Sequence, residues 1–103
     1  MDAGREPRLS FQTLRVLDVL LGSAAELSGM DIRRETELAT GTLYPILMRL
    51  EEAGWLESRW EEVDPHEVGR PRRRLYRATA VGARKARAAF DQLGAGRGRL
   101  AWG

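Results

Sequence analysis

The chain of 103 residues contains no cysteine, one histidine and one lysine. The absence of cysteine excludes a disulfide framework and a thiolate site. The single histidine, His66, has no second histidine or cysteine with which to form a zinc site, and we expect it to be a solvated or phosphate-facing loop residue. The sequence also lacks a Walker-type glycine loop and the set of nucleophile, histidine and acid that would indicate an enzyme. We therefore expect no catalysis, no metal and no cofactor.

Long apolar runs are absent too. Asp18 interrupts the longest apolar stretch, and no segment reaches the ~20 apolar residues that a membrane-spanning helix needs. The N-terminal residues MDAGREPR have no apolar signal-peptide region. Hydrophobic residues make up 43% of the chain, which suits one small domain with a modest core. We expect a soluble cytoplasmic protein, and so small a core favours oligomerisation.

Positive charge is hardly in excess, since 17 basic and 15 acidic residues give a net charge of +2. Its distribution is uneven: residues 26–64 hold ten acidic and four basic side chains, whereas residues 66–103 hold two acidic and ten basic ones. The stretch GRPRRRLYRAT, residues 69–79, contains five arginines. Genome composition can favour arginine over lysine but does not explain clustering. The cluster is typical of a nucleic-acid binder.

The first expected helix follows a loose lead-in over residues 1–8. Ser10 is a good cap, and the helix should run to about Leu21 and stop at Gly22. Its apolar residues spread almost all the way round a helical wheel, so every side needs covering. We expect a second copy of the chain to cover one side; the alternative is that neighbouring helices of the same chain do so.

Two further helices should form a closely spaced pair. Ser28 would cap a short helix over residues 29–37. Thr40 or Thr42 would cap the next, with Pro45 near its first turn and Gly54 ending it. Its apolar residues fall on one stripe, and the opposite face carries an aromatic ring and a methionine.

A β-hairpin and a last helix complete the expected order. LESRWEE alternates, with Leu56, Ser58 and Trp60 on one face, and RRRLYRA reads as a second strand after a loop of nine residues. Thr79 would cap a helix to about Leu93. Two of the three tryptophans, Trp55 and Trp60, are expected in the core, and Trp102 in a disordered Gly-rich tail.

This order predicts an α+β, mainly helical fold: a winged helix-turn-helix with a C-terminal dimerisation helix. The domain would span residues 9–79, the dimerisation helix 80–93 and a flexible tail 94–103. Recognition helices meet base edges through exposed residues near their N-terminus, and wing arginines bind phosphates or a minor groove. The predicted DNA contacts are Ser28, Thr40, Thr42, Tyr44, Pro45, Met48 and Arg49 in the helical pair and Arg70, Arg72, Arg73 and Arg74 in the wing.

Two sequence elements at this separation resemble the PadR family of bacterial transcriptional regulators, in its short-tailed subgroup. They are TGTLYPILMRLEEAGWLES and GRPRRRLYRAT, the latter followed by a glycine three residues after its threonine. The resemblance covers roughly residues 9–93. It implies a dimeric winged-helix DNA binder, usually a repressor, that in some members releases DNA when a small aromatic or amphipathic molecule binds. It carries DNA contact onto Thr42, Tyr44, Pro45, Arg70 and Arg72. Leu75 and Ala78 depart from the family pattern in the second strand.

The resemblance also implies that the first and last helices form the dimer interface. A dimer would place two recognition helices about one DNA turn, ~34 Å, apart on a pseudo-palindromic operator. An apolar effector is expected in a groove between the copies, or else the groove residues pack on one another. The predicted interface residues are Phe11, Leu14, Leu17, Leu21, Ala83, Ala86, Phe90 and Leu93.

Several alternatives stay open from the sequence. A winged helix can also serve as a protein-interaction module without sequence-specific DNA binding. Tyr44 either reaches DNA or packs against the side of the first turn. Arg77 reaches either DNA or an acidic residue such as Glu57 or Glu61. The operator, the effector and the choice between repressor and activator are not encoded in any readable pattern.

Overall fold

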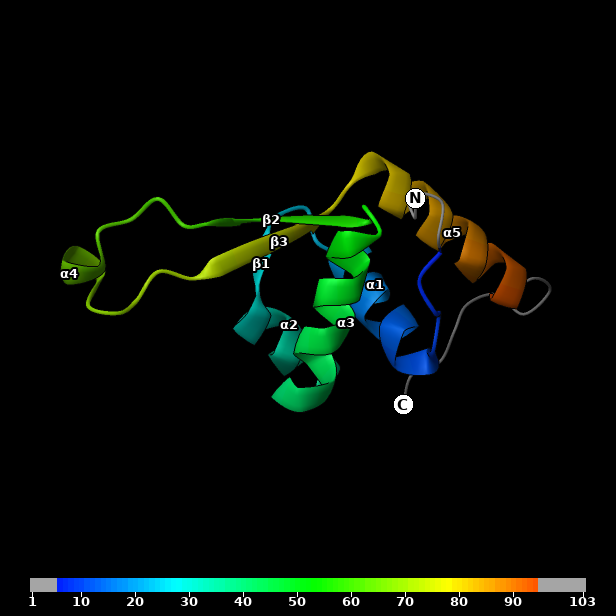
Figure 1. Ribbon diagram of the computed structural model, residues 1–103, viewed down its shortest axis with the longest axis horizontal. Coiled ribbons are helices and arrows are strands. Elements are labelled where there is room, and N and C mark those ends of the chain that lie inside the picture. The colour runs from blue at the N-terminus through cyan, green and yellow to red at the C-terminus, as the bar shows by residue number, and fades with distance from the viewer. Residues whose placement is uncertain (1–5, 95–103) are drawn as a thin grey trace.

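The computed structural model describes residues 6–94, as five helices and a small antiparallel sheet (Figure 1). The expected mixed fold of a winged helix-turn-helix is confirmed. Most of the predicted lead-in and tail, including Trp102, lies outside the described residues.

Helix α1 (Phe11–Leu21) has the predicted ends. The side chain of Ser10 accepts a hydrogen bond from the Thr13 backbone N–H at 3.1 Å, and the N–H of Gly22 donates to the Asp18 carbonyl at 3.0 Å. These caps satisfy backbone groups that a helix leaves unpaired at its termini. Most of the apolar ring of α1 is buried inside this chain, because α2, β3 and α5 pack around it.

Helix α2 (Gly29–Thr36) begins with a capping box that the sequence only half predicted. The side chain of Ser28 accepts from the Asp31 N–H, and the Asp31 carboxylate accepts from the Ser28 N–H, both at 3.1 Å. Aspartate at this position replaces the more common glutamate or glutamine. The helix ends at Glu37, whose φ of 61° lies in the left-handed region.

Helix α3 (Thr40–Glu52) begins earlier than predicted. Ala39 is the N-cap and makes no side-chain capping bond, so the expectation that Thr40 or Thr42 caps the helix was wrong. Pro45 consequently lies inside the helix rather than in its first turn. The inward stripe of Leu43, Ile46, Leu47 and Leu50 is buried and anchors the helix in the core.

Three strands form the sheet in the order β1-β3-β2, all antiparallel: β1 (Leu27–Ser28), β2 (Leu56–Trp60) and β3 (Arg74–Ala78). The hairpin of β2 and β3 was predicted, whereas β1 was not, because two residues carry no readable alternation. The loop of the hairpin also contains the short helix α4 (Pro65–Val68), started by Asp64 as N-cap. We call residues 56–78 the wing.

Helix α5 (Ala80–Gly94) is tied to the turn between α3 and β2. The Thr79 hydroxyl donates to the Gly54 carbonyl at 2.7 Å and accepts from the Gly82 N–H at 2.9 Å. A Cβ atom on Gly82 would lie 2.0 Å from the carbonyl oxygen of Trp55, so only glycine permits this approach. The predicted cap at Thr79 is therefore confirmed, and the same residue joins two parts of the fold.

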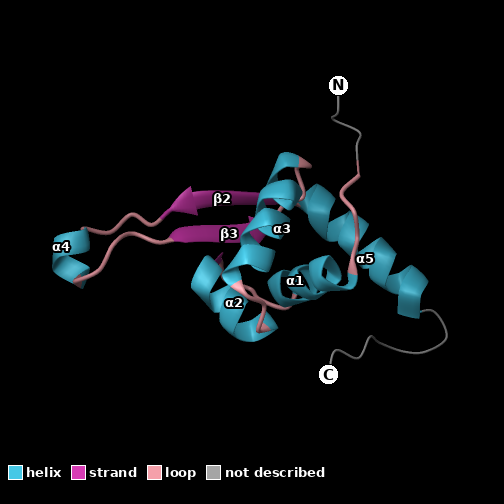
Figure 2. Ribbon diagram, turned by 60° about the horizontal axis from the view of Figure 1, so that its bottom comes forward, coloured by secondary structure: helices cyan, strands magenta, loops and turns pink. Residues whose placement is uncertain are grey.

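The wing and α5 extend to opposite sides of the three-helix body (Figure 2). The molecule measures 51 × 37 × 25 Å along its principal axes. Helix α4 lies at the far end of the wing, away from the hydrophobic core. The core therefore holds the base of the wing, and contacts within the wing must hold the rest.

Candidate nucleic-acid interface

Helix α3 presents one face to solvent, opposite its buried stripe. We call it the outward face of α3: Thr40, Tyr44, Met48 and Arg49 are exposed, and Pro45 is half-buried. Thr42 is half-buried at its margin. Most of the residues predicted from α3 thus share one surface at and after the helix N-terminus.

Tyr44 is partly exposed and partly packed, and it packs against the start of α2. Its side chain is 40% exposed, yet a Cβ atom on Gly29 would lie 2.2 Å from the tyrosine hydroxyl oxygen. The hydroxyl therefore rests against the start of α2, and the ring provides the exposed surface. Glycine at position 29 is required for this close approach between the helices.

Ser28 does not belong to this surface. Its side chain is engaged in the capping box of α2, and the residue is only 2% exposed. The prediction of a DNA contact by this side chain disagrees with its burial. A buried hydroxyl that already caps a helix has no access to an external phosphate.

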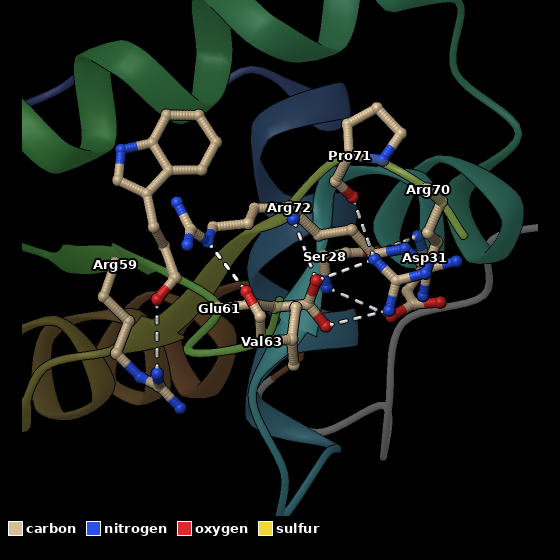
Figure 3. A network of polar contacts seen from close by, with 10 residues as sticks. Ser28, Asp31, Arg59, Glu61, Val63, Arg70, Pro71 and Arg72 are labelled. Atoms are coloured by element: carbon tan, nitrogen blue, oxygen red, sulfur yellow. Dashed lines mark hydrogen bonds and ion pairs between the residues drawn. The ribbon is translucent and has the colours of Figure 1, made fainter. Parts of the chain in front are cut away.

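Within the wing, Glu61 binds two segments of the returning chain (Figure 3). Its carboxylate accepts two hydrogen bonds from the Arg70 guanidinium, at 2.8 and 3.1 Å, and one from the Arg73 backbone N–H at 2.9 Å. The bond from Arg70, then the bond from the Arg73 backbone, lowers the pKa of Glu61 to about 2. We call these contacts the Glu61 clamp. Arg70, predicted as a DNA contact, is therefore engaged inside the wing.

Arg72 and Arg73 are the exposed members of the predicted arginine set. Arg72 donates through Nε to the Val63 carbonyl at 2.9 Å, which directs its side chain along the loop (Figure 3). The pKa of Asp31 is lowered mainly by the Ser28 backbone N–H, with smaller contributions that include the positive charge of Arg73. The charge of Arg73 thus acts near the start of α2.

Arg74 belongs to a chain of contacts that joins the wing to the end of α3. The Ser58 hydroxyl donates to the Glu51 carboxylate at 2.7 Å and accepts from Arg74 Nε at 3.0 Å. The Arg74 guanidinium also lies 5.0 Å from the ring centroid of Trp60, a cation–π contact. We call this set the Glu51–Ser58–Arg74 link; it connects α3, β2 and β3.

The two tryptophans around β2 have opposite environments. Trp55 is buried, as predicted. Trp60 is 57% exposed, so the expectation that it belongs to the core was wrong. Alternation along the strand places Trp60 on the core-facing side, but by this point the wing has extended beyond the core.

Opposite charges also meet elsewhere on the wing. Arg59 contacts the Glu26 carboxylate at 2.6 Å, and Arg77 Nε donates to Glu57 at 2.5 Å. Hydrogen bonding from Arg59 lowers the pKa of Glu26. Of the acidic partners that the sequence offered for Arg77, the structure shows Glu57.

The far end of the wing carries exposed acidic side chains. Glu62, Asp64 and Glu67 are exposed there, and so is His66. An open hollow of about 1350 Å³ lies beside Trp60 and Pro71 and reaches Asp64. Arg72, which donates to the carbonyl of Val63, lies beside these acidic residues, so both signs of charge occur on the outer part of the wing.

The predicted dimer residues divide into two groups. Leu14, Leu17 and Ala86 are buried in the chain's own core, so their side chains do not face a partner. The others are exposed or half-buried. We refer to these five residues of α1 and α5 together as the apolar strip: Phe11, Leu21, Ala83, Phe90 and Leu93.

Residues 6–94 contain no group of three or more histidine, aspartate or glutamate side chains suited to a metal ion. None of the helices in this part of the chain is both long enough and apolar enough to cross a membrane.

Residues 20–88 match the sequence model described as Transcriptional regulator PadR-like family. A solved PadR family transcriptional regulator from Eggerthella lenta is 28% identical, with a TM-score of 0.62 over 76% of this chain and 70% of that one. One from Clostridium difficile is 20% identical, with a TM-score of 0.68 over 82% and 88%. Among curated proteins, no sequence matches the chain.

The AbfR protein shares the fold as well. Its overoxidized form bound to DNA is 23% identical, with a TM-score of 0.68 over 84% of this chain and 58% of AbfR. The chain spans 60% of disulfide-formed AbfR and 52% of AbfR of Staphylococcus epidermidis. At this identity the likeness concerns the fold.

Proposed function

Because the chain belongs to the PadR-like family of transcriptional regulators, we propose that it binds double-stranded DNA in a sequence-specific manner and thereby regulates transcription in the cytoplasm. The family is one of regulators and not of enzymes. Residues 9–79 would form the DNA-binding domain and residues 80–93 the dimerisation helix.

The outward face of α3 is the observation that carries this proposal. Its exposed side chains lie at and after the N-terminus of α3, and the leucine and isoleucine side chains on the opposite side of the helix are buried in the core. A rigid helix that projects this way suits insertion into a major groove. Among similar folds, reduced and overoxidized AbfR have both been solved bound to DNA, which supports the same use here.

The wing arginines would have two different roles. Arg72 and Arg73 are exposed, so we assign them to phosphate contacts; Arg72 donates to the Val63 carbonyl through Nε and would use its terminal nitrogens. Arg70 and Arg74 are occupied by the Glu61 clamp and the Glu51–Ser58–Arg74 link, so we assign them to holding the wing. Thr40 and Thr42, at the start of α3, would also contact the backbone.

The apolar strip supports the proposed homodimer. Phe11 and Leu93 are among its exposed large side chains, and pairing two copies would remove them from water. Such pairing sets two copies of α3 in a fixed relation, which calls for a pseudo-palindromic operator. The interface is smaller than the sequence indicated, because Leu14, Leu17 and Ala86 are already buried.

Repression with release by an effector is the more detailed proposal. A dimer bound over a promoter excludes other proteins from the same DNA. A small apolar or aromatic effector would bind between the copies, against Phe11, Phe90 and Leu93, and change the spacing of the two α3 helices. Leu14, which was also predicted at the interface, is buried in the core and would not line this groove.

The test is selection of duplexes from a random pool with the purified chain, followed by affinity measurements at several salt concentrations. Sequence-specific binding should yield an enriched motif with inverted half-sites. The logarithm of the binding constant should fall linearly with that of salt, with a slope of about −0.9 per phosphate contact. An unenriched pool, or binding that ignores salt, would contradict the proposal.

A protein-interaction module is the second candidate, because of the acidic far end of the wing. Glu62, Asp64 and Glu67 would be repelled by phosphates and would favour a basic protein surface. If no duplex binds, neutralising these three carboxylates and assaying partner binding becomes the informative experiment.

A further inference from the structure

The outward face of α3 is unusually apolar for a surface in water. Met48 is 56% exposed and Tyr44 is 40% exposed. They are four residues apart on a helix, so they lie next to each other on one side. Two adjacent apolar side chains held in solvent by a well-packed helix indicate a surface meant for contact.

This face has little capacity to read bases through hydrogen bonds. Paired hydrogen bonds to adenine require asparagine or glutamine, and those to guanine require arginine or lysine. Helix α3 contains no asparagine, glutamine or lysine, and Arg49 is its single arginine. The hydroxyl of Tyr44 rests against Gly29, so this residue presents its ring rather than a donor.

We propose that Tyr44 and Met48 recognise the 5-methyl group of thymine in the major groove. This inference rests on the proposed function, because it requires α3 to enter that groove. The thymine methyl is the apolar group that base pairs display there. Contact with a thioether or an aromatic ring removes apolar surface on both sides from water. Arg49, at the edge of the face, reads guanine or phosphate instead.

The experiment replaces thymine by uracil, which removes the methyl group and leaves every hydrogen-bonding group of the base unchanged. Duplexes enriched with the full chain serve as probes, and each thymine is replaced singly. At positions under α3 the dissociation constant should rise about threefold to fivefold, as expected for one buried methyl group. Thymines outside these positions should tolerate the replacement.

Two variants assign the effect to residues. In Met48→Ala and in Tyr44→Ala, the ratio of uracil to thymine affinity should approach one at the position that the truncated side chain covers. In Tyr44→Phe the ratio should persist, because the ring remains. Val81→Ala removes an exposed apolar side chain on α5 and should leave every ratio unchanged. Circular dichroism verifies that each variant is folded.

The outcomes separate this inference from the proposed function. If no duplex binds, both fail. If duplexes bind but uracil equals thymine at every position under α3, DNA binding stands and methyl recognition is wrong. The same holds if the enriched half-sites contain no thymine, or if both alanine variants keep the parental ratios. The inference is supported if the ratio of uracil to thymine affinity approaches one in either alanine variant and keeps its parental value in Tyr44→Phe.

Discussion

The outward face of α3 and the wing are both exposed, but they differ in what their side chains already contact. On α3, Met48 and the ring of Tyr44 are held out by a helix whose opposite side is fixed in the core. On the wing, Arg70, Arg74 and Arg77 each have an acidic, hydroxyl or aromatic partner. Arg77 shows that even an exposed arginine of the wing can already be bound by a carboxylate, so exposure alone does not mark such a side chain as available.

The difference follows from distance to the core. Helix α3 is positioned by buried leucines and needs no polar contacts to hold its shape. The wing projects beyond the core, where hydrophobic burial is small, so polar and charged contacts must define its conformation. Much of the arginine cluster that dominates the sequence is used for this purpose.

The largest effect is expected where α5 meets the turn after α3. In Gly82→Ala, the new Cβ atom would lie 2.0 Å from the carbonyl oxygen of Trp55 and 2.6 Å from its Cα, and backbone atoms cannot move aside without a shift of the whole turn. We expect about 1–3 kcal/mol lower free energy of unfolding, as is typical of overpacking. Chemical denaturation measures the loss. Gly29→Ala is the matched comparison and should cost less, because its Cβ atom meets only the end of the exposed Tyr44 side chain, and equal losses in the two variants would contradict this reasoning.

A smaller effect is expected from the exposed wing arginine. Arg72→Ala should weaken binding to all duplexes alike, by about eightfold at 0.1 M salt, and reduce the salt slope by about 0.9. Arg70→Ala is the matched control, since Arg70 is engaged by Glu61. It should loosen the wing without changing the slope. The salt slope of each variant is measured by binding titrations at four salt concentrations. Equal slopes in Arg72→Ala and Arg70→Ala would contradict the proposal that only Arg72 contacts phosphate.

A smaller effect is expected from breaking the Glu51–Ser58–Arg74 link. Ser58→Ala removes the hydroxyl that bridges Glu51 and Arg74. We expect a loss of about 1 kcal/mol in unfolding free energy, because a hydrogen-bonded hydroxyl contributes this much. DNA affinity should fall modestly for every sequence, without a change in sequence preference. A changed preference would mean that the link positions α3 itself.

The smallest effect concerns pH. The pKa of Glu61 is lowered to about 2, so the stabilisation from its ionised form is fully present above about 4.5 and lost as pH falls through about 2. Chemical shifts of the Arg70 and Arg73 amides should therefore stay constant from pH 7 to about pH 4. Glu61→Gln should shift them at all pH values. A titration of these amides near pH 4.5 in the parent chain would contradict the Glu61 clamp.

The sequence predicted the parts of this fold that depend on local chemistry. Caps at Ser10, Ser28 and Thr79 stand where expected, because a side-chain oxygen serves the adjacent backbone. The start of α3 was missed, since Ala39 caps through backbone conformation alone. The strand β1 was missed because it exists only through pairing with Tyr76 and Leu75.

The location of the candidate site was predicted from the sequence, but the side-chain pairings within it were not. Residue type and helical period were enough to place Tyr44 and Met48 on one exposed face. The pairing of Arg70 with Glu61 depends on how a nine-residue loop folds back, and periodicity carries no signal for that. The acidic residues flanking the arginine cluster were the available hint, because opposite charges at the two ends of a hairpin tend to meet.

The contact of Gly82 with Trp55 has a mechanical consequence. Thr79 and Gly82 fasten the first turn of α5 to the turn that ends α3, through Gly54 and Trp55. The end of α3 and the start of α5 therefore share one set of contacts, and a displacement of α5 that preserved these contacts would also displace the end of α3. Substituting Gly82 would disrupt the contacts and weaken this connection.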